Sequence, residues 1–471
     1  MTPTTGEFRA HVRLALADTE LQRALRKVKG GFVDKRRLAH DALAEWDQIR
    51  ERAKQVKDHT LAHLDHYLEC YERQVLASGG HVHWARDAEE ARDIVLDICR
   101  SANAKRVTKG KSMISEEIAL NQALQTAGLD VVETDLGEYI IQLADEPPSH
   151  IIAPAIHKTR EQITELFHTH HQQHGLTGWV TEIPDIVNEA RTVLREAFLS
   201  ADVGITGANF LVAETGSSVI VTNEGNGDLT NTLPDVHIVT ASIDKVIPTL
   251  DDLGNVLRLL ARSGTGQEMS SYTTLSTGPR RPDDLDGPRE YHVVLLDNGR
   301  SRVLGGEFRD MLRCIRCGAC LNHCPVYGAV GGHAYGWVYS GPMGAVWTPL
   351  IKGLDGARHL PNACTLNGRC AEICPMSIPL PDLLRKLRKV DFEQRSVPAS
   401  QRWLLKLWAW IAQRPKLYQR LCSAGIGLLG LFGRRRGGFR WLPFANGWTA
   451  ARDFPAPSGE TFQQAWKRRR H

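Results

Sequence analysis

The chain contains the stretch Cys314-Ile-Arg-Cys317-Gly-Ala-Cys320-Leu-Asn-His-Cys324-Pro325, which holds four of its ten cysteines. Gaps of two, two and three residues, followed by proline, are typical of a loop that binds an iron–sulfur cluster. The short gaps let one tight loop place three thiolates around one face of a cluster. The fourth cysteine leaves the loop and, in two-cluster proteins, binds the other cluster. Zinc is the alternative, but zinc sites seldom use three evenly spaced cysteines plus Cys-Pro.

A second stretch, Cys364-Thr-Leu-Asn367-Gly-Arg-Cys370-Ala-Glu-Ile-Cys374-Pro375, repeats this pattern with one change. Asn367 stands where the middle cysteine of the motif belongs. If the fourth ligands are exchanged between the motifs, the sequence predicts one site with four thiolates and one with three. The expected ligands are Cys314, Cys317, Cys320 and Cys374 for the first site, and Cys324, Cys364 and Cys370 for the second.

The spacing of the second stretch resembles that of the iron–sulfur subunit of succinate dehydrogenase and fumarate reductase, where it holds a three-iron cluster. The resemblance implies either a [3Fe–4S] cluster or a [4Fe–4S] cluster with a labile iron near Asn367, and the sequence leaves both open. We expect a [4Fe–4S] cluster in the first site. The long connection between Cys324 and Cys364 does not suit a compact bacterial ferredoxin and indicates an α-helical ferredoxin-type domain over residues 301–395.

Net charge is unevenly distributed over the 471 residues. Residues 401–471 contain 14 Lys or Arg and two acidic residues, whereas the other 400 residues carry a net charge of −8. Six of the eleven Trp also lie in this basic region. Positive charge interleaved with Trp indicates contact with a membrane face or a partner subunit, and a merely solvated basic region is the alternative. Nucleic acid is not expected, because no recognition motif accompanies the charge.

The cellular compartment follows from the cysteine usage and the N-terminus. The first residues have no apolar segment of the kind found in secretory signals. Clustered Cys-x2-Cys spacing without such a signal favours metal binding in a reducing compartment over disulfides. The apolar stretch 421–433 is shorter than the roughly 20 residues that a spanning helix needs. We therefore expect a cytoplasmic protein, with peripheral contact at the inner face of the membrane through the basic region.

The pattern of apolar residues and the composition divide the chain into four parts. Residues 1–75 repeat apolar residues at three- and four-residue intervals and predict helices. Residues 76–300 alternate short apolar runs with helical stretches, which indicates βα units and a largely parallel sheet. The iron–sulfur domain follows at 301–395, and the basic, Trp-rich region occupies 396–471. The expected strands are 81–85, 105–108, 130–133, 150–153, 201–205, 219–222, 237–241 and 291–296, and the expected helices between them are 87–102, 115–127, 159–171, 184–198 and 251–262.

Several segments of the α/β part resemble the lactate-utilisation (LUD) domain. The first begins at Lys111, follows a strand and opens a helix for which Ser115 is a plausible N-cap. The segments that carry the resemblance are 111–118, 133–142, 148–154, Gly204-Ile-Thr-Gly-Ala-Asn209, Ala213-Glu-Thr-Gly-Ser217 and Thr222-Asn-Glu-Gly-Asn226. The LUD domain is in turn similar to the sugar-phosphate isomerase and CoA-transferase fold, an α/β sandwich.

With the twin cluster motif after it, nearly the whole chain resembles the lactate utilisation protein B family. That resemblance implies the iron–sulfur subunit of a three-protein bacterial system that oxidises L-lactate. The implied partners are a Cys-rich iron–sulfur protein and a second LUD protein. The departure from a complete second motif lies at Asn367.

The chemistry of lactate oxidation limits what this chain is expected to do. Two electrons leave lactate as a hydride equivalent, whereas iron–sulfur clusters accept one electron at a time. No motif for a flavin or a nicotinamide is visible, so we expect an electron relay rather than a complete enzyme. In the alternative, the LUD domain binds or converts the substrate, with Glu214, Glu224 and Lys111 as candidate catalytic residues. A third hypothesis is a cluster-dependent regulatory or scaffold subunit.

Overall fold

The computed structural model describes residues 4–394, 399–433, 435–443, 445–449 and 452–469. The chain forms two compact units, residues 1–389 and 390–471. The finer boundaries expected at residues 75, 300 and 395 stay predictions. Among the described residues, no helix has the length and apolar character needed to cross a membrane.

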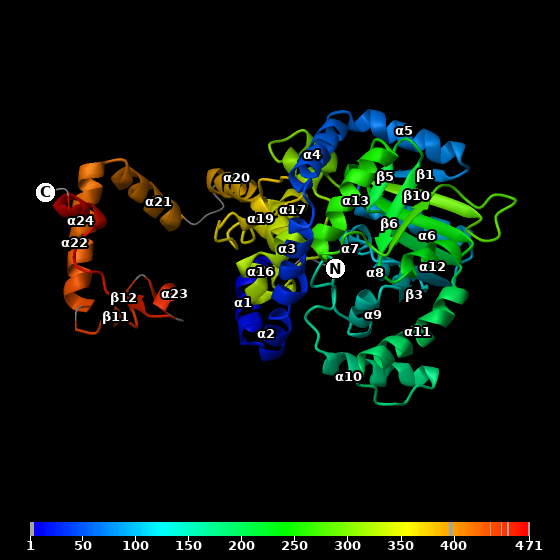
Figure 1. Ribbon diagram of the computed structural model, residues 1–471, viewed down its shortest axis with the longest axis horizontal. Coiled ribbons are helices and arrows are strands. Elements are labelled where there is room, and N and C mark those ends of the chain that lie inside the picture. Colours follow the sequence, from blue (N-terminus) through cyan, green and yellow to red (C-terminus); the bar gives the residue numbers. More distant parts are fainter. Residues whose placement is uncertain (1–3, 395–398, 434, 444, 450–451, 470–471) are drawn as a thin grey trace. The chain divides into compact units, whose positions relative to one another are not determined.

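Six parallel strands form the main sheet of the first unit, which is shown in Figure 1. In spatial order they are β1 (His81–Ala85), β10 (Glu290–Leu296), β7 (Val236–Ser242), β4 (Val203–Gly207), β2 (Arg106–Lys109) and β3 (Asp130–Glu133). The central strands β7 and β10 are buried along almost their full length, as is expected of parallel strands covered on both faces. Because all six strands are parallel, their carboxyl ends meet at one edge of the sheet.

A smaller sheet of four strands packs beside the main one. Its order is β8 (Val246–Ile247), β5 (Phe210–Val212), β6 (Ser217–Thr222) and β9 (Tyr272–Ser276). Strands β5 and β6 form a hairpin whose turn contains Gly216 with a φ of +71°. A Cβ on Gly216 would lie 2.6 Å from the backbone nitrogen of Val75, so both the turn and the close approach require glycine.

Helices cover both faces of the main sheet. One face packs on α6 and α8, and the other packs on α5 and the strands β5 and β8. The helices of the N-terminal and α/β parts are α1 (Phe8–Ala17), α2 (Thr19–Leu25), α3 (Asp34–Asp41), α4 (Trp46–Ala62), α5 (Leu64–Ala77), α6 (Ala88–Ser101), α7 (Met113–Glu117), α8 (Leu120–Thr126), α9 (Leu136–Leu143), α10 (Arg160–His170), α11 (Ile183–Leu199), α12 (Asn226–Thr232) and α13 (Leu250–Gly264).

The cysteine-rich part is helical and shares a core with the α/β part. Its helices are α14 (Arg300–Leu304), α15 (Ala319–Asn322), α16 (Pro325–Val330), α17 (Gly341–Lys352), α18 (Leu354–Ala357), α19 (Arg369–Glu372) and α20 (Leu380–Glu393). Figure 1 shows α1, α2 and α3 beside these helices, and α1 and α2 contact α16. One apolar cluster joins residues of α4, α13, α17 and α20. The N-terminal helices therefore pack on the cysteine-rich part as well as on the α/β part.

The second unit consists of short elements around one long helix. They are α21 (Ala399–Ala412), α22 (Pro415–Gly433), β11 (Gly438–Phe439), α23 (Asn446–Thr449), β12 (Phe454–Pro455) and α24 (Phe462–Arg469). Strands β11 and β12 form a two-stranded antiparallel ladder. All six Trp side chains of this region are exposed, with Trp403 at 63% and Trp441 at 66%. The expected apolar stretch 421–433 forms the C-terminal part of α22.

Most expected strands and helices of the α/β part are present, and three expectations are wrong. Residues 150–153 form a bent loop rather than a strand, because the His150 ring accepts the N–H groups of Ile152 and Ala153. The expected helix 115–127 is two helices, α7 and α8, which are separated at Ala119 with a φ of +54°. The N-cap of α7 is Ser112, whose hydroxyl accepts the N–H of Ser115. Strands β5, β8 and β9 were not expected.

Candidate iron–sulfur site

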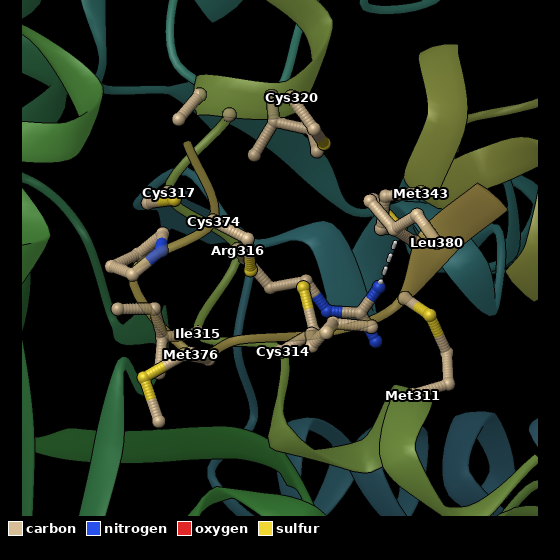
Figure 2. A pocket seen from close by; sticks show the side chains of 15 residues that line it. Met311, Cys314, Ile315, Arg316, Cys317, Cys320, Met343, Cys374, Met376 and Leu380 are labelled. Atoms are coloured by element: carbon tan, nitrogen blue, oxygen red, sulfur yellow. Dashed lines mark hydrogen bonds between the residues drawn. The ribbon is translucent and has the colours of Figure 1, made fainter. Parts of the chain in front are cut away.

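Four cysteine side chains from two separate parts of the sequence line one cavity, which we call the cysteine cavity (Figure 2). Its empty volume is about 400 Å³, including the part open to solvent. We call these four residues the first cysteine group: Cys314, Cys317, Cys320 and Cys374. The remaining lining is almost entirely apolar and includes Ile151, Met311, Met343, Met376 and Leu380. Cys324 does not line this cavity, although it is close to Cys320 in sequence.

Three of the six remaining cysteines form a second group: Cys324, Cys364 and Cys370. Burial, with a smaller contribution from the neighbouring Cys364 and Cys324, raises the pKa of Cys370 to about 12. Two backbone N–H groups point at sulfur in this group. Leu366 donates to Cys364 over 3.3 Å and Tyr327 donates to Cys324 over 3.5 Å. Such N–H···S bonds stabilise a thiolate, which is the form that binds iron.

The two cysteine loops repeat the same backbone turns. Arg316 and Leu366 occupy equivalent positions and have φ angles of +60° and +56°. Gly318 and Gly368 follow two residues later with φ angles of +72° and +84°, and each begins a short helix. Positive φ is costly for a residue with a side chain, so its recurrence at matching positions marks a shared loop geometry. Asn367 therefore occupies the backbone position of Cys317.

Asn367 lies at the surface, whereas Cys317 at the matching position is half-buried. Its side chain is exposed, and its amide oxygen accepts the N–H of Arg369 over 3.2 Å. This local hydrogen bond is the type that asparagine forms in turns. The second group therefore offers three thiols and an amide that is already bonded to its own loop.

The donor atoms of the first group fit an iron–sulfur cluster. Burial raises the pKa of Cys317 to about 12, and burial together with Cys314 raises the pKa of Cys320 well above its usual range. Bound iron would instead hold these groups as thiolates. Among the described residues, no imidazole or carboxylate lines the cysteine cavity. Sulfur ligands alone in an apolar enclosure are the donor set expected for such a cluster.

Two arginines of the N-terminal helices hold the backbone around Cys374. Arg36 of α3 donates to the carbonyl oxygen of Ile373 over 2.8 Å, and Arg50 of α4 donates to that of Cys374 over 2.8 Å. These contacts join residues more than 320 positions apart. Arg36 is also close enough to Cys317 and Cys374 for their thiolates to raise its pKa, which burial lowers. The sequence does not signal either arginine, because the amphipathic pattern of residues 1–75 does not tell which part of the chain those helices contact.

A buried ionic network connects the α/β part to the cysteine-rich part. The fully buried Arg300 makes two hydrogen bonds to Glu117, of 3.0 and 2.8 Å, and one of 2.9 Å to Asp244. Tyr339 donates to Glu117 over 2.6 Å. Burial alone would raise the pKa of both carboxyl groups, but Arg300 lowers it. Removing one partner from such a network costs about 3–5 kcal/mol, because the other charge is left buried and unpaired.

Three further cations lie close to Cys314. Burial lowers the pKa of Lys57 and of Lys245 to about 8, and the Cys314 thiolate opposes both shifts. Arg316 places its guanidinium 4.6 Å from the centre of the Tyr339 ring and 5.0 Å from that of Trp347. Figure 2 shows Arg316 beside Cys314, with its hydrogen bond to the Met343 sulfur dashed. Positive charge at this place stabilises the negative charge of a thiolate-bound cluster.

A second and larger cavity opens at the carboxyl edge of the main sheet, and we call it the sheet-edge cavity. Its empty volume is about 1390 Å³, including the part open to solvent. It is lined by segments that follow β2, β4 and β7, by β6, by the end of α13 and by the first cysteine loop. Ile151, Arg316 and Cys317 line both this cavity and the cysteine cavity. The two cavities are therefore adjacent.

The candidate catalytic residues of the LUD domain fall in different places. Lys111 and Glu224 both line the sheet-edge cavity. The ammonium of Lys111 donates to the carbonyl oxygen of Ile152. Partial burial raises the pKa of Glu224, and the nearby Asp135 raises it further. Glu214 does not line the cavity; its carboxylate accepts the N–H of Leu250 over 3.0 Å at the start of α13.

Three family models match successive parts of the chain. The LUD domain matches residues 68–296, the 4Fe-4S dicluster domain matches residues 310–378, and the model described as lactate utilisation protein B, C-terminal, matches residues 387–471. The dicluster match contains both cysteine groups. The chain is therefore an iron–sulfur protein with an α/β LUD domain before the dicluster domain.

Two curated proteins are similar to this chain over nearly its full length. "Lactate utilization protein B" of Bacillus pumilus (strain SAFR-032) is 42% identical over 465 residues, which cover 98% of this chain and 97% of that protein. "Uncharacterized electron transport protein YkgF" of Escherichia coli (strain K12) is 42% identical over 98% of this chain and 96% of its own length. A solved DUF162 family protein from Deinococcus radiodurans covers 50% of this chain and 98% of its own, with 15% identity and a TM-score of 0.29, too weak a likeness to argue from.

Proposed function

Because the chain belongs to the lactate utilisation protein B family, we propose that it is the electron-transfer subunit of a multi-protein system that oxidises L-lactate to pyruvate. The observation that carries the proposal is the pair of cysteine groups in one helical module, one with four thiols and one with three. Bound iron–sulfur clusters supply one-electron oxidation and reduction. A two-electron acceptor for lactate then belongs to another part of the system.

Each cysteine group has a defined task in this proposal. Cys314, Cys317, Cys320 and Cys374 would hold a [4Fe–4S] cluster. Cys324, Cys364 and Cys370 would hold a [3Fe–4S] cluster or a [4Fe–4S] cluster whose fourth iron lacks a thiolate. The exposed position of Asn367 would leave that iron open to exchange with solvent.

The residues around the first group position its ligands. Arg36 and Arg50 hold the carbonyl oxygens of Ile373 and Cys374, so the ligand from the second motif is fixed by the N-terminal helices. Met311 and Met343 help to exclude water from the cysteine cavity. Exclusion of water strengthens the influence of nearby charges on the thiolates.

The proposed partners are a Cys-rich iron–sulfur protein and a second LUD protein. The basic, Trp-rich second unit would dock on a partner or rest on the inner face of the membrane. Exposed Trp403, Trp408 and Trp410 on α21, together with the Lys and Arg of this unit, support such contact.

The test compares the subunit alone with the complete system. Full-length protein with its clusters reconstituted anaerobically is mixed with L-lactate and a redox dye, with and without the two partner proteins. We expect dye reduction only in the complete mixture, none with Cys317→Ser, and full activity with the control Cys70→Ser, since Cys70 lies on α5 away from both groups. Dye reduction by the subunit alone would contradict the relay and move catalysis into the LUD domain. No reduction by the complete mixture would contradict the assignment to lactate.

A further inference from the structure

We propose that the sheet-edge cavity binds a small organic carboxylate, and that its carboxylate group lies at Lys245 and Arg316, directly beside Cys317. Identification of this ligand as a 2-hydroxy acid or its 2-keto product rests on the proposed function. The position of the binding site does not depend on the proposed function, because it follows from the cavity and the two cations that line it. The cavity lies at the carboxyl ends of parallel strands, which is the usual place for ligands in open α/β sheets.

Lys245 is the first reason to expect an anion. Its side chain is 94% buried, since only 6% is exposed, and it lines the cavity. Among the described residues it takes part in no hydrogen bond or ion pair. The neighbouring buried Lys57 differs in this respect, because its ammonium donates to the carbonyl oxygens of Asp244 and Val246. A buried ammonium without a hydrogen-bond acceptor is unfavourable, and a ligand carboxylate would supply one.

Arg316 is the second reason. Its guanidinium lies against the Tyr339 and Trp347 rings and bonds to the Met343 sulfur, and no carboxylate of the described residues pairs with it. Asp244 is close enough to raise the pKa of both Lys245 and Arg316, but its carboxylate is bonded to Arg300, as is that of Glu117. Planar guanidinium groups suit carboxylates because two N–H groups can donate in parallel. Lys245 and Arg316 thus bring two positive charges to the part of the cavity beside the first cysteine loop, and neither forms an ion pair with a carboxylate of the described residues.

Two carboxylates, Asp135 and Glu224, also line the cavity. Asp135 and Glu224 lie close to each other, and Lys111 is close enough to lower the pKa of Glu224. The cavity lining therefore holds one charged group of two cations, Lys245 and Arg316, and a second, mixed group of Lys111, Asp135 and Glu224. A carboxylate is attracted to Lys245 and Arg316 and repelled by Asp135 and Glu224, which favours one orientation.

The remaining lining favours a small polar ligand over a flat aromatic cofactor. Tyr339 is the one aromatic side chain among the lining residues, and it is engaged with Glu117 and Arg316. Hydroxyl and amide groups are frequent instead: Ser112, Thr206, Asn209, Thr222, Asn223, Asn226, Thr265 and Gln267. Such groups hydrogen-bond hydroxyl and carbonyl oxygens. A stacked ring system would find no platform here.

The experiment measures carboxylate binding to the full-length protein with its clusters in place. Oxalate, pyruvate and L-lactate are titrated anaerobically by calorimetry, and the EPR spectrum of the first cluster is recorded with and without each of them. We expect saturable binding and a changed EPR line shape of the first cluster alone. Lys245→Met should weaken binding by tenfold or more, because a charge-assisted hydrogen bond is lost. Lys245→Arg should retain most of it.

Lys57→Met is the matched control. It removes a buried positive charge that also interacts with Cys314 and Asp244, but from a side chain that does not line the cavity. We expect its affinity for carboxylates to stay within threefold of the wild type. Equal weakening by Lys57→Met and Lys245→Met would overturn the proposed contact, and absence of binding to wild type would overturn the site. Absent binding together with lactate oxidation by the complete system would reject this site and leave the proposed function intact.

Discussion

The two cysteine groups have matching backbone turns and different surroundings. Arg316 and Gly318 of the first loop match Leu366 and Gly368 of the second in their positive φ angles. The first group is enclosed by apolar side chains, lies close to buried cations and adjoins the sheet-edge cavity. The second group has Asn367 exposed beside it and no fourth thiol. The local sequence thus sets the shape of a cysteine loop, whereas distant parts of the chain set its electrostatic environment.

The largest expected effect is the loss of one cluster from a mutation in the opposite motif. Cys374→Ser should abolish the cluster of the first group and leave that of the second, because Cys374 lines the cavity of Cys314, Cys317 and Cys320. Iron and sulfide analysis with low-temperature EPR would measure this, with Cys70→Ser as the control. Loss of the second cluster, with the first retained, would show that Cys374 binds the cluster of its own motif and not that of the first group.

The next effect is a change of cluster type in the second group. Asn367→Cys restores a thiol at the backbone position that matches Cys317, so a three-iron cluster should become a four-iron cluster. EPR of the oxidised protein reports the three-iron form, and iron analysis should rise by one atom per chain. An unchanged spectrum and iron content would show that a four-iron cluster already occupies this group.

Removal of residues 399–471 should affect neither cysteine group, because all seven thiols precede it. It should weaken attachment to anionic vesicles, since each Lys or Arg near such a surface adds about 1 kcal/mol. Co-sedimentation at low and high salt would measure this, because salt screens the attraction. If full-length and truncated proteins behave alike, the basic region docks on a protein or is only solvated.

The smallest expected effect separates the two groups by their electrostatics. Lys57→Met removes a buried charge near Cys314, so reduction of the first cluster becomes less favourable. Its midpoint potential should fall by roughly 50 mV, while that of the second cluster stays unchanged. Redox titration followed by EPR would measure both. Lys54→Met is the control, because Lys54 lies one turn earlier on α4, is 31% exposed and pairs with Glu51. An equal shift from Lys54→Met would show that local burial does not set the potential.

The sequence alone predicted the elements whose signals are local. Alternating apolar runs identified the six strands of the main sheet, and the cysteine spacing identified both loops. It failed where a contact with another segment overrides the local pattern. Residues 150–153 read as a strand, but His150 is buried, bonds to the N–H groups of Ile152 and Ala153, and contacts Asn322 over 3.0 Å. The short strands β5 and β8 also lack a periodic signal of their own.

The two cysteine loops could be predicted from the local sequence, because a cluster-binding loop requires cysteines only a few residues apart. The sequence also determined the family, because the segments that carry the resemblance are contiguous. Only the tertiary structure brought Arg36 and Arg50 to Cys374, placed Lys57 and Lys245 near Cys314, and joined the sheet-edge cavity to the first cysteine loop. These contacts connect residues separated by up to several hundred positions. No short-range pattern encodes them, because burial and packing of the whole first unit decide which side chains meet.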